Sequence, residues 1–195
     1  MAVAINLISR RVKGLYIFLF SLLLLTLVPY VSLMVPLVSS GFKSAGFYSL
    51  GGVLGGYIAY LIMGKTTPAY KRDYLESLTL AAPLMYGLGK IGCAFGGCCG
   101  GRTIHGKVFP IQKVEAICFI VVFLVSCYLR YKEVYKVHVA IIVYTMLKFV
   151  LDFFRFTHDV KMISVNQLVC AIIVCIAIMS YKIKSAKMEV RNGSE

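Results

Sequence analysis

Several ionisable side chains lie inside apolar stretches of the sequence, where charged groups are costly and usually functional. In YTMLKFVLDFFRF, Tyr144, Lys148, Asp152 and Arg155 follow one another at intervals of four, four and three residues. In a helix this spacing puts all four on one face. Together with Lys90, a lysine in another apolar stretch, the bases outnumber the acid, so an anion such as a lipid phosphate would complete the group. The alternative is that Lys148 pairs with Asp152 while Arg155 extends to the membrane surface.

The stretch GKIGCAFGGCCGG, at residues 89–101, contains six glycines and three cysteines. We expect its glycines, beginning with Gly89 and Gly92, to break the helix and expose backbone N–H groups, a geometry that holds anions. Such irregular backbone is tolerated at membrane depth only where protein or a wet cavity covers it. The polar residues that follow are Arg102, His105, Lys107, Gln112 and Glu115. The stretch therefore predicts a basic, glycine-lined cavity that accepts a phospholipid headgroup.

The three cysteines of this stretch, Cys93, Cys98 and Cys99, are open to four interpretations. A thiolate favoured by nearby Lys90 would serve nucleophilic or acid–base chemistry. Cys93 would form a disulfide with one of the adjacent pair on an oxidising face of the membrane. Three thiols and His105 would make four metal ligands, but their spacing is not that of a usual zinc site. Finally, the cysteines would pack as small residues. We predict no metal and no other cofactor.

The composition is that of a membrane protein. Hydrophobic residues make up 59% of the 195, against roughly 45–50% in soluble domains, and the mean hydropathy is +0.83. The formal charge is +13, but the bases lie in short clusters between apolar runs, a pattern that favours membrane loops over a nucleic-acid surface.

Six apolar stretches approach the roughly 20 residues that a bilayer span needs. They are residues 15–38, 47–63, 76–95, 114–129, 137–156 and 163–181. These predict an all-α integral membrane protein with about six transmembrane helices, or seven if one is broken or a half helix. We expect a single polytopic domain over residues 1–195 with a loose tail at 182–195. Gly51 and Gly52 belong to a smooth glycine face in the second stretch that admits another helix or a lipid.

The basic residues between these stretches predict the orientation, because cytoplasmic loops are enriched in Lys and Arg. Thirteen bases fall on one side and six on the other. The richer side holds both ends of the chain. Both termini are therefore predicted to be cytoplasmic, and residues 96–112 to face outward.

Four stretches, in order, resemble the prolipoprotein diacylglyceryl transferase family. GKIGCAFGGCCGG is similar to the family signature G-R-x-G-N-F-x-N-x-E-x-x-G and more so to the version of its cysteine-bearing relatives, of which this chain looks like a divergent member. SLGGVLGG resembles H-G-G-L-I-G, and FPIQKVEA resembles H-P-T-Q-L-Y-E-A. YTMLKFVLDFFR, followed by ISVNQL, resembles Y-G-x-x-R-F-x-x-E-F-x-R and L-S-x-x-Q. The resemblance covers about residues 45–180.

The resemblance implies a membrane enzyme that moves the diacylglyceryl group of phosphatidylglycerol to a lipoprotein cysteine and releases glycerol phosphate. Lys90 and Lys148 stand at the positions of essential family arginines, and they keep the charge without the bidentate fork. Cys93 and Cys98 replace the signature Asn and Glu. The residues that match family positions directly are Tyr144, Gln112, Glu115, Asp152 and Arg155.

These matches assign roles to the candidate residues. Acid–base chemistry goes to Glu115 or Asp152, with His105 in reserve and Cys93 and Cys98 as thiol candidates. The predicted phosphate- and lipid-binding residues are Lys90, Lys148, Arg155, Tyr144, Gln112, Gly89, Gly92, Gly51 and Gly52.

The favoured function is a phosphatidylglycerol-dependent transferase in a bacterial plasma membrane, acting on a cysteine thiol, such as that of a lipobox-bearing preprotein, or on another acceptor. One alternative is a non-catalytic membrane protein that binds lipid or peptide on the same fold. The second is a membrane thiol–disulfide protein that uses Cys93, Cys98 and Cys99.

Overall fold

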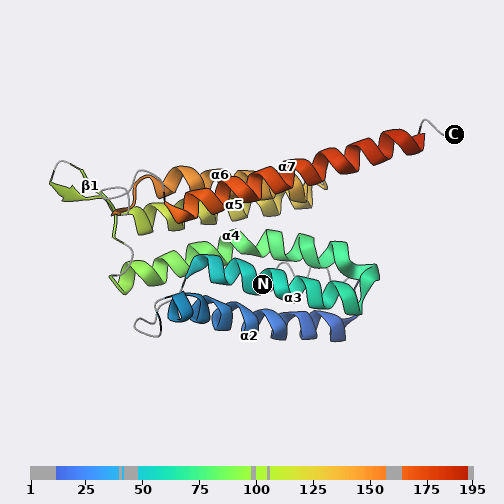
Figure 1. Ribbon diagram of the computed structural model, residues 1–195, viewed down its shortest axis with the longest axis horizontal. Coiled ribbons are helices and arrows are strands. Elements are labelled where there is room, and N and C mark those ends of the chain that lie inside the picture. The colour runs from blue at the N-terminus through green and yellow to red at the C-terminus, as the bar shows by residue number, and fades with distance from the viewer. Residues whose placement is uncertain are drawn as a thin grey trace. The chain divides into compact units, whose positions relative to one another are not determined.

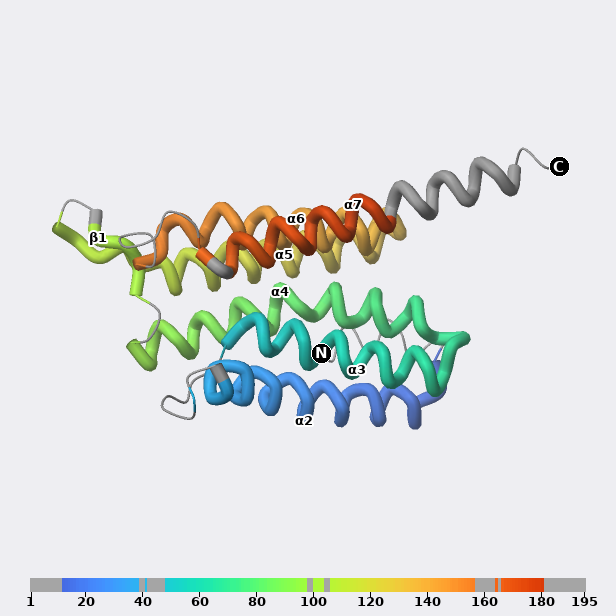
Figure 2. The backbone as a smooth tube through the Cα atoms, viewed as in Figure 1, coloured from blue at the N-terminus to red at the C-terminus, as the bar shows by residue number. Residues whose placement is uncertain are grey.

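A computed structural model of the chain describes residues 12–39, 41, 48–97, 100–104, 106–156 and 164–192 (Figures 1 and 2). The predicted all-α class is confirmed, and each of the six predicted stretches overlaps one helix, although the stretch 137–156 continues past the end of its helix at Asp152. Within the described residues these helices are α2 (Gly14–Ser39), α3 (Ser49–Thr66), α4 (Lys71–Phe95), α5 (Ile111–Tyr131), α6 (Val137–Asp152) and α7 (Val165–Asn192). A short 3-10 helix, η1 (Pro68–Tyr70), precedes α4, and the chain divides into two compact units, Met1–Ala82 and Pro83–Glu195.

The first unit is built on close packing of α2 against α3. A Cβ atom on Gly51 would lie 2.6 Å from the Cα of Ser32, and one on Gly55 would lie 2.5 Å from the Leu27 carbonyl oxygen. Glycines spaced in this way let two helix backbones approach. The sequence left open whether this face meets a helix or a lipid, and at Gly51 and Gly55 it meets a helix.

The second unit joins the end of α4 to α5, α6 and α7, and α6 contacts both α5 and α7. Ile111, Phe119 and Leu151 form its buried apolar cluster. Between α4 and α5 lies a small antiparallel hairpin of β1 (Thr103–Ile104) and β2 (Lys107–Val108).

The glycines at the start of the signature stretch do not interrupt α4. The helix runs through Gly89 and Gly92 to Phe95, and the Gly96 N–H donates to the Gly92 carbonyl at 2.9 Å. The expectation that the helix breaks from Gly89 onward is therefore wrong. A glycine costs a helix only about 1 kcal/mol relative to alanine, and in a membrane the helix is what satisfies the backbone. The turn comes at Gly97, whose φ of +65° ends the helix in the left-handed conformation.

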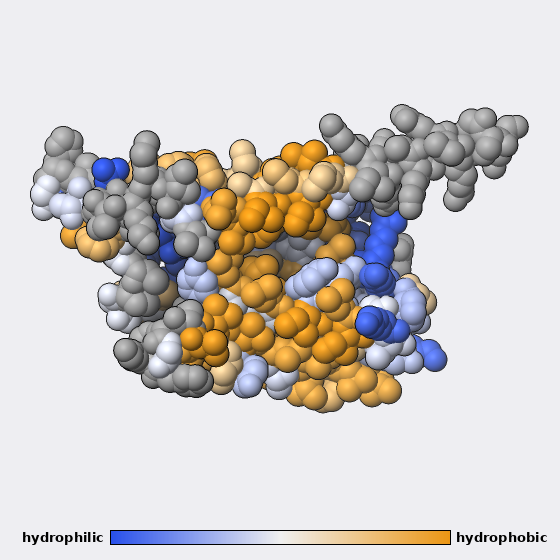
Figure 3. Space-filling view, in the orientation of Figure 1, coloured by the Kyte–Doolittle hydropathy of each residue, from blue (hydrophilic) through white to orange (hydrophobic). Residues whose placement is uncertain are grey.

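Three of the described helical segments have the length and apolar composition to cross a membrane. They are Gly14–Val38, Pro68–Phe95 and Ile111–Tyr131. Hydrophobic residues occupy much of the face drawn in Figure 3, and large apolar side chains such as Leu25, Leu124 and Val150 are more than half exposed. A lipid environment would accommodate this surface.

Candidate functional site: a buried ionic cluster

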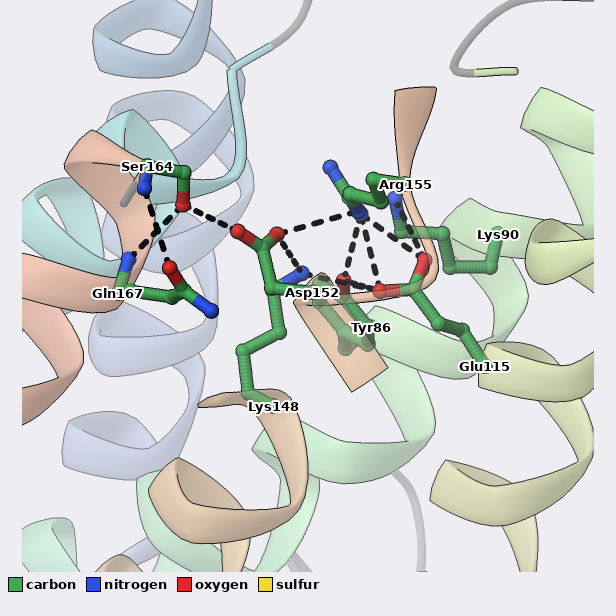
Figure 4. Close-up of polar contacts among 8 residues, drawn as sticks. All are labelled: Tyr86, Lys90, Glu115, Lys148, Asp152, Arg155, Ser164 and Gln167. Atoms are coloured by element: carbon green, nitrogen blue, oxygen red, sulfur yellow. Dashed lines mark hydrogen bonds and ion pairs between the residues drawn. The ribbon is translucent and has the colours of Figure 1, made fainter. Parts of the chain in front are cut away.

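The polar centre of the second unit gathers side chains from four helices and one turn (Figure 4). They are Tyr86 and Lys90 of α4, Glu115 of α5, Lys148 and Asp152 of α6, Arg155 just after α6, and Ser164 and Gln167 at the start of α7.

Glu115 is the central acceptor of this cluster, and it is 0% exposed. Its carboxylate lies 3.1 Å from the Lys90 ammonium and 2.9 Å from that of Lys148. Arg155 Nη2 donates to both oxygens at 2.9 Å, and the Tyr86 hydroxyl donates to Oε1 at 3.0 Å. Both oxygens of Glu115 are thus engaged by cations.

Asp152 forms the second negative centre and is 1% exposed. Its Oδ1 lies 3.6 Å from Lys148 Nζ and 3.3 Å from Arg155 Nε. The Ser164 hydroxyl donates to Oδ2. With every group ionised, three cations and two carboxylates leave the cluster one net positive charge. Buried charges are tolerated when they are paired in this way.

The glycine-rich connection between α4 and α5 helps to hold Arg155 in place. Gly101 forms a β-bridge with Arg155, while the Arg102 N–H donates to the Phe154 carbonyl at 2.9 Å. A Cβ atom on Gly101 would lie 1.8 Å from the carbonyl oxygen of Phe109. Because only a residue without Cβ fits there, Gly101 lets the connection lie against the turn that carries Arg155.

A capping box begins α7. The Ser164 hydroxyl accepts from the Gln167 N–H at 3.1 Å, and the Gln167 side-chain oxygen accepts from the Ser164 N–H at 3.1 Å. This reciprocal arrangement is the S-x-x-Q form of the motif, which satisfies two donors at a helix start. Because the same hydroxyl donates to Asp152, the start of α7 is joined directly to the ionic cluster.

Tyr86 contacts four of the five charged residues. Its hydroxyl bonds Glu115 and accepts from Arg155 Nη2 at 3.2 Å. Its ring centroid lies 5.2 Å from the ammonium of Lys90 and 5.2 Å from that of Lys148. Tyr86 was not predicted as a site residue from the sequence, although it stands one helical turn before Lys90 and on the same face.

A family model describing prolipoprotein diacylglyceryl transferases matches residues 8–183. The chain belongs to the prolipoprotein diacylglyceryl transferase family. No curated protein and no solved structure matched the chain. Family membership confirms the resemblance seen in the four sequence stretches and extends it over most of the chain.

Most of the ionisable candidates of this family member come together as a group. Lys90, Glu115, Lys148, Asp152 and Arg155 all enter the cluster. The expected lack of negative charge is smaller than predicted, because Glu115 adds a second carboxylate. The alternative, that Lys148 pairs with Asp152 while Arg155 extends to the membrane surface, is right about the contact between Lys148 and Asp152. It is wrong about Arg155, whose side chain is 13% exposed and bonds Glu115 instead of extending to the surface.

Tyr144 points elsewhere, although it lies one turn from Lys148. Its hydroxyl is 2.7 Å from Ser126 Oγ on α5 and 3.5 Å from the Tyr135 hydroxyl. Helical side chains lean toward the helix N-terminus, which carries the phenol of Tyr144 away from Asp152 and Arg155. Shared spacing on one face therefore did not bring the hydroxyl into the cluster.

The remaining candidates differ in where they lie. Gln112 is half-buried in the first turn of α5, and Cys93 is half-buried on α4, three residues after Lys90. Gly89 and Gly92 are exposed on α4, and a Cβ atom on either would meet nothing within 4 Å.

Gly51 and Gly52 lie on α3 of the first unit, facing α2. Cys98, Cys99 and His105 lie outside the described residues, so the predicted disulfide and the thiol chemistry stay predictions.

Proposed function

We propose that this chain is a phospholipid-dependent transferase of its family. It moves the diacylglyceryl group of phosphatidylglycerol to a thiol, such as that of a lipobox-bearing preprotein, at a bacterial plasma membrane. In this proposal six helices span the membrane and both termini are cytoplasmic. The observation that carries the proposal is the buried cluster of Lys90, Lys148 and Arg155, whose two carboxylate partners leave one positive charge uncompensated.

The charge of the reaction matches the charge of this cluster. A phosphatidylglycerol phosphodiester carries one negative charge, so a headgroup bound at the cluster makes the site neutral. In the transfer, a C–S bond forms as the bond between the diacylglyceryl carbon and the phosphate oxygen breaks. The leaving glycerol phosphate gains a second negative charge, and the thiol proton neutralises one carboxylate. The site is again neutral, and such balance matters where the dielectric constant is low.

Asp152 is the better placed of the two carboxylates to accept the thiol proton. A proton on Glu115 would displace one of the donors that hold its oxygens at 2.9–3.1 Å. Asp152 meets its two cations at the longer distances of 3.3 and 3.6 Å. Its third partner is the Ser164 hydroxyl, which can turn from donor to acceptor. In this proposal Glu115 orders the cations, and Asp152 serves as the base.

Release of glycerol phosphate tests the proposal. Purified protein is incubated in detergent micelles with phosphatidylglycerol labelled in its headgroup and a peptide bearing a lipobox cysteine. We expect labelled glycerol phosphate to appear together with a peptide that has gained the diacylglyceryl mass. The matched control peptide has serine in place of the cysteine and should yield neither product.

A second candidate function, binding lipid without turnover, is favoured by one observation. Glu115 already contacts all three cations, so these cations have a structural role in the fold and need not take part in a reaction. Saturable binding of phosphatidylglycerol, with no glycerol phosphate released in the presence of either peptide, would favour this function over the transferase.

A further inference from the structure

We propose that Tyr86 is a positioning residue for the two lysines that hold the substrate phosphate. This inference rests on the proposed function. It extends that function to a residue that lies in none of the four stretches that resemble the family. Tyr86 lies on α4, one turn before Lys90, and its ring centroid is 5.2 Å from both lysine ammoniums. A cation at this distance from an aromatic ring is attracted to the negative charge on its face.

The need for such a residue follows from lysine chemistry. A lysine carries a compact charge on a flexible four-carbon stem, whereas the planar guanidinium of arginine carries its donors in a fixed fork. Lys90 and Lys148 come from different helices, so neither fixes the other. The ring of Tyr86 attracts both ammoniums, and it belongs to a side chain with few rotatable bonds, so it can hold both at fixed positions.

Tyr86 is itself held at both ends. Its ring packs against Phe119 with a centroid distance of 4.4 Å, and its hydroxyl donates to Glu115 while accepting from Arg155. Packing and hydrogen bonds of this kind keep a supporting residue in one rotamer.

The ring contact also differs in kind from the Glu115 contact. An incoming phosphate competes with the Glu115 carboxylate for the lysine protons, because both are anions that accept from the same donors. It does not compete with the ring, which interacts through the face of its π-system. Tyr86 therefore keeps both ammoniums in place while their hydrogen bonds pass from Glu115 to the phosphate. Loss of the ring should lower kcat more than it raises KM.

An isosteric series at position 86 tests this directly. Phenylalanine and its mono-, di- and trifluoro forms are placed there by nonsense suppression, since fluorine withdraws charge from the ring face with little change of shape. We expect kcat to fall stepwise along the series, by about tenfold in total. The same series at Phe149, whose ring packs edge-on against Phe153, should leave kcat unchanged. A flat series at position 86 would overturn the proposal, whatever the effect of Tyr86→Phe alone.

Exchange of the lysines supplies the second test. Tyr86→Leu should lower kcat at least about tenfold in the natural chain. It should have a clearly smaller effect when Lys90→Arg and Lys148→Arg are both present, because the guanidinium fork is less dependent on an outside reference. An equal loss in both backgrounds would mean that Tyr86 acts only as packing and would contradict the inference.

A labelling experiment separates this inference from the proposed function. Lysines of the folded protein are acylated for short times and quantified by peptide mass spectrometry, with the exposed Lys132 as reference. We expect the trifluorinated ring to raise the labelling of Lys90 and Lys148 severalfold over phenylalanine, and Lys132 to stay constant. If the natural chain releases no glycerol phosphate, the transferase proposal fails, and the labelling still decides the role of Tyr86. Unchanged labelling across the series would reject it.

Discussion

The hydroxyl of Ser164 donates to Oδ2 of Asp152 and at the same time accepts from the Gln167 N–H in the first turn of α7. One oxygen atom thus connects the cap of a helix to a charge in the ionic cluster. Ser164 therefore has two roles, capping α7 and bonding Asp152, and substitutions can separate them.

Replacement of Ser164 by aspartate should keep the cap and damage the cluster. Aspartate caps a helix as well as serine does, but its charge would repel Asp152. Ser164→Ala should lose both parts, with a stability cost of about 1 kcal/mol. Thermal unfolding and glycerol phosphate release are measured for both variants. We expect both variants to turn over poorly, and Ser164→Asp to lose thermal stability although it keeps the cap, because two like charges would be buried side by side. Full turnover in Ser164→Asp would show that the bond to Asp152 is unimportant.

The two lysines should depend on charge. Lys90→Ala and Lys148→Ala should each reduce turnover by roughly ten- to a hundredfold, because a charged hydrogen bond is worth about 1.5–3 kcal/mol. Lys90→Arg and Lys148→Arg should retain activity, since they restore a bidentate donor. The assay is release of glycerol phosphate by the four single variants. Full activity in both alanine variants would remove the basis for a phosphate site.

The two carboxylates should respond differently to neutralisation. Glu115→Gln leaves the three cations with one carboxylate, so they should bind the product glycerol phosphate more tightly. Glycerol phosphate should therefore inhibit this variant at lower concentrations than it inhibits the natural chain. Asp152→Asn removes the proposed base, and kcat should fall by about 10²–10⁴-fold with little change in KM. Steady-state kinetics with product inhibition measure both effects. If Asp152→Asn turns over normally and Glu115→Gln does not, the two roles are the reverse of those proposed.

Two glycines of the signature stretch should differ sharply. Gly101→Ala forces a Cβ atom against the Phe109 carbonyl, and overpacking of this kind costs about 1–3 kcal/mol. Gly92→Ala meets open space within α4 and should raise helix stability by up to about 1 kcal/mol. Thermal unfolding of the two variants gives the comparison. Normal turnover in Gly92→Ala would also show that this glycine is not needed for close approach of a lipid.

The distribution of basic residues predicts the topology. A tag placed after Glu195 or within residues 66–72 should be cytoplasmic, and one near Thr103 should face outward. Labelling of single-cysteine tags in intact cells with an impermeant reagent measures this. A protected tag near Thr103 would overturn the orientation.

The helices were predictable because apolar runs in the sequence indicate them directly, and each predicted stretch overlaps a described helix. The charged members of the site were predictable for a related reason, since Lys90, Lys148 and Asp152 stand out in apolar sequence. Glu115 was a candidate, but its place as the shared acceptor depends on three-dimensional packing of α4, α5 and α6. No spacing rule within one helix contains that information.

The misses have separate physical causes. Tyr86 was overlooked because a tyrosine in an apolar helix is most often ordinary packing, and only its neighbours in space distinguish it. Tyr144 was misplaced because residue spacing gives the face of a helix and not the direction of a long side chain. The capping box of Ser164 and Gln167 was readable, since S-V-N-Q before an apolar run fits its pattern. Gly89 and Gly92 do not break α4, because in a membrane the helix is needed to satisfy the backbone hydrogen-bonding groups.

The ion pair between Lys90 and Glu115 has a consequence for how the protein is made. When α4 is synthesised, Glu115, which pairs with Lys90, has not yet been made. A lone charge in a membrane helix costs several kcal/mol. The next helix, α5, carries the compensating Glu115. Insertion of α4 and α5 as one hairpin would neutralise both charges before either meets lipid. Because α5 is the next helix after α4 in the chain, the two can insert together, and biosynthesis as well as chemistry would then constrain this part of the chain.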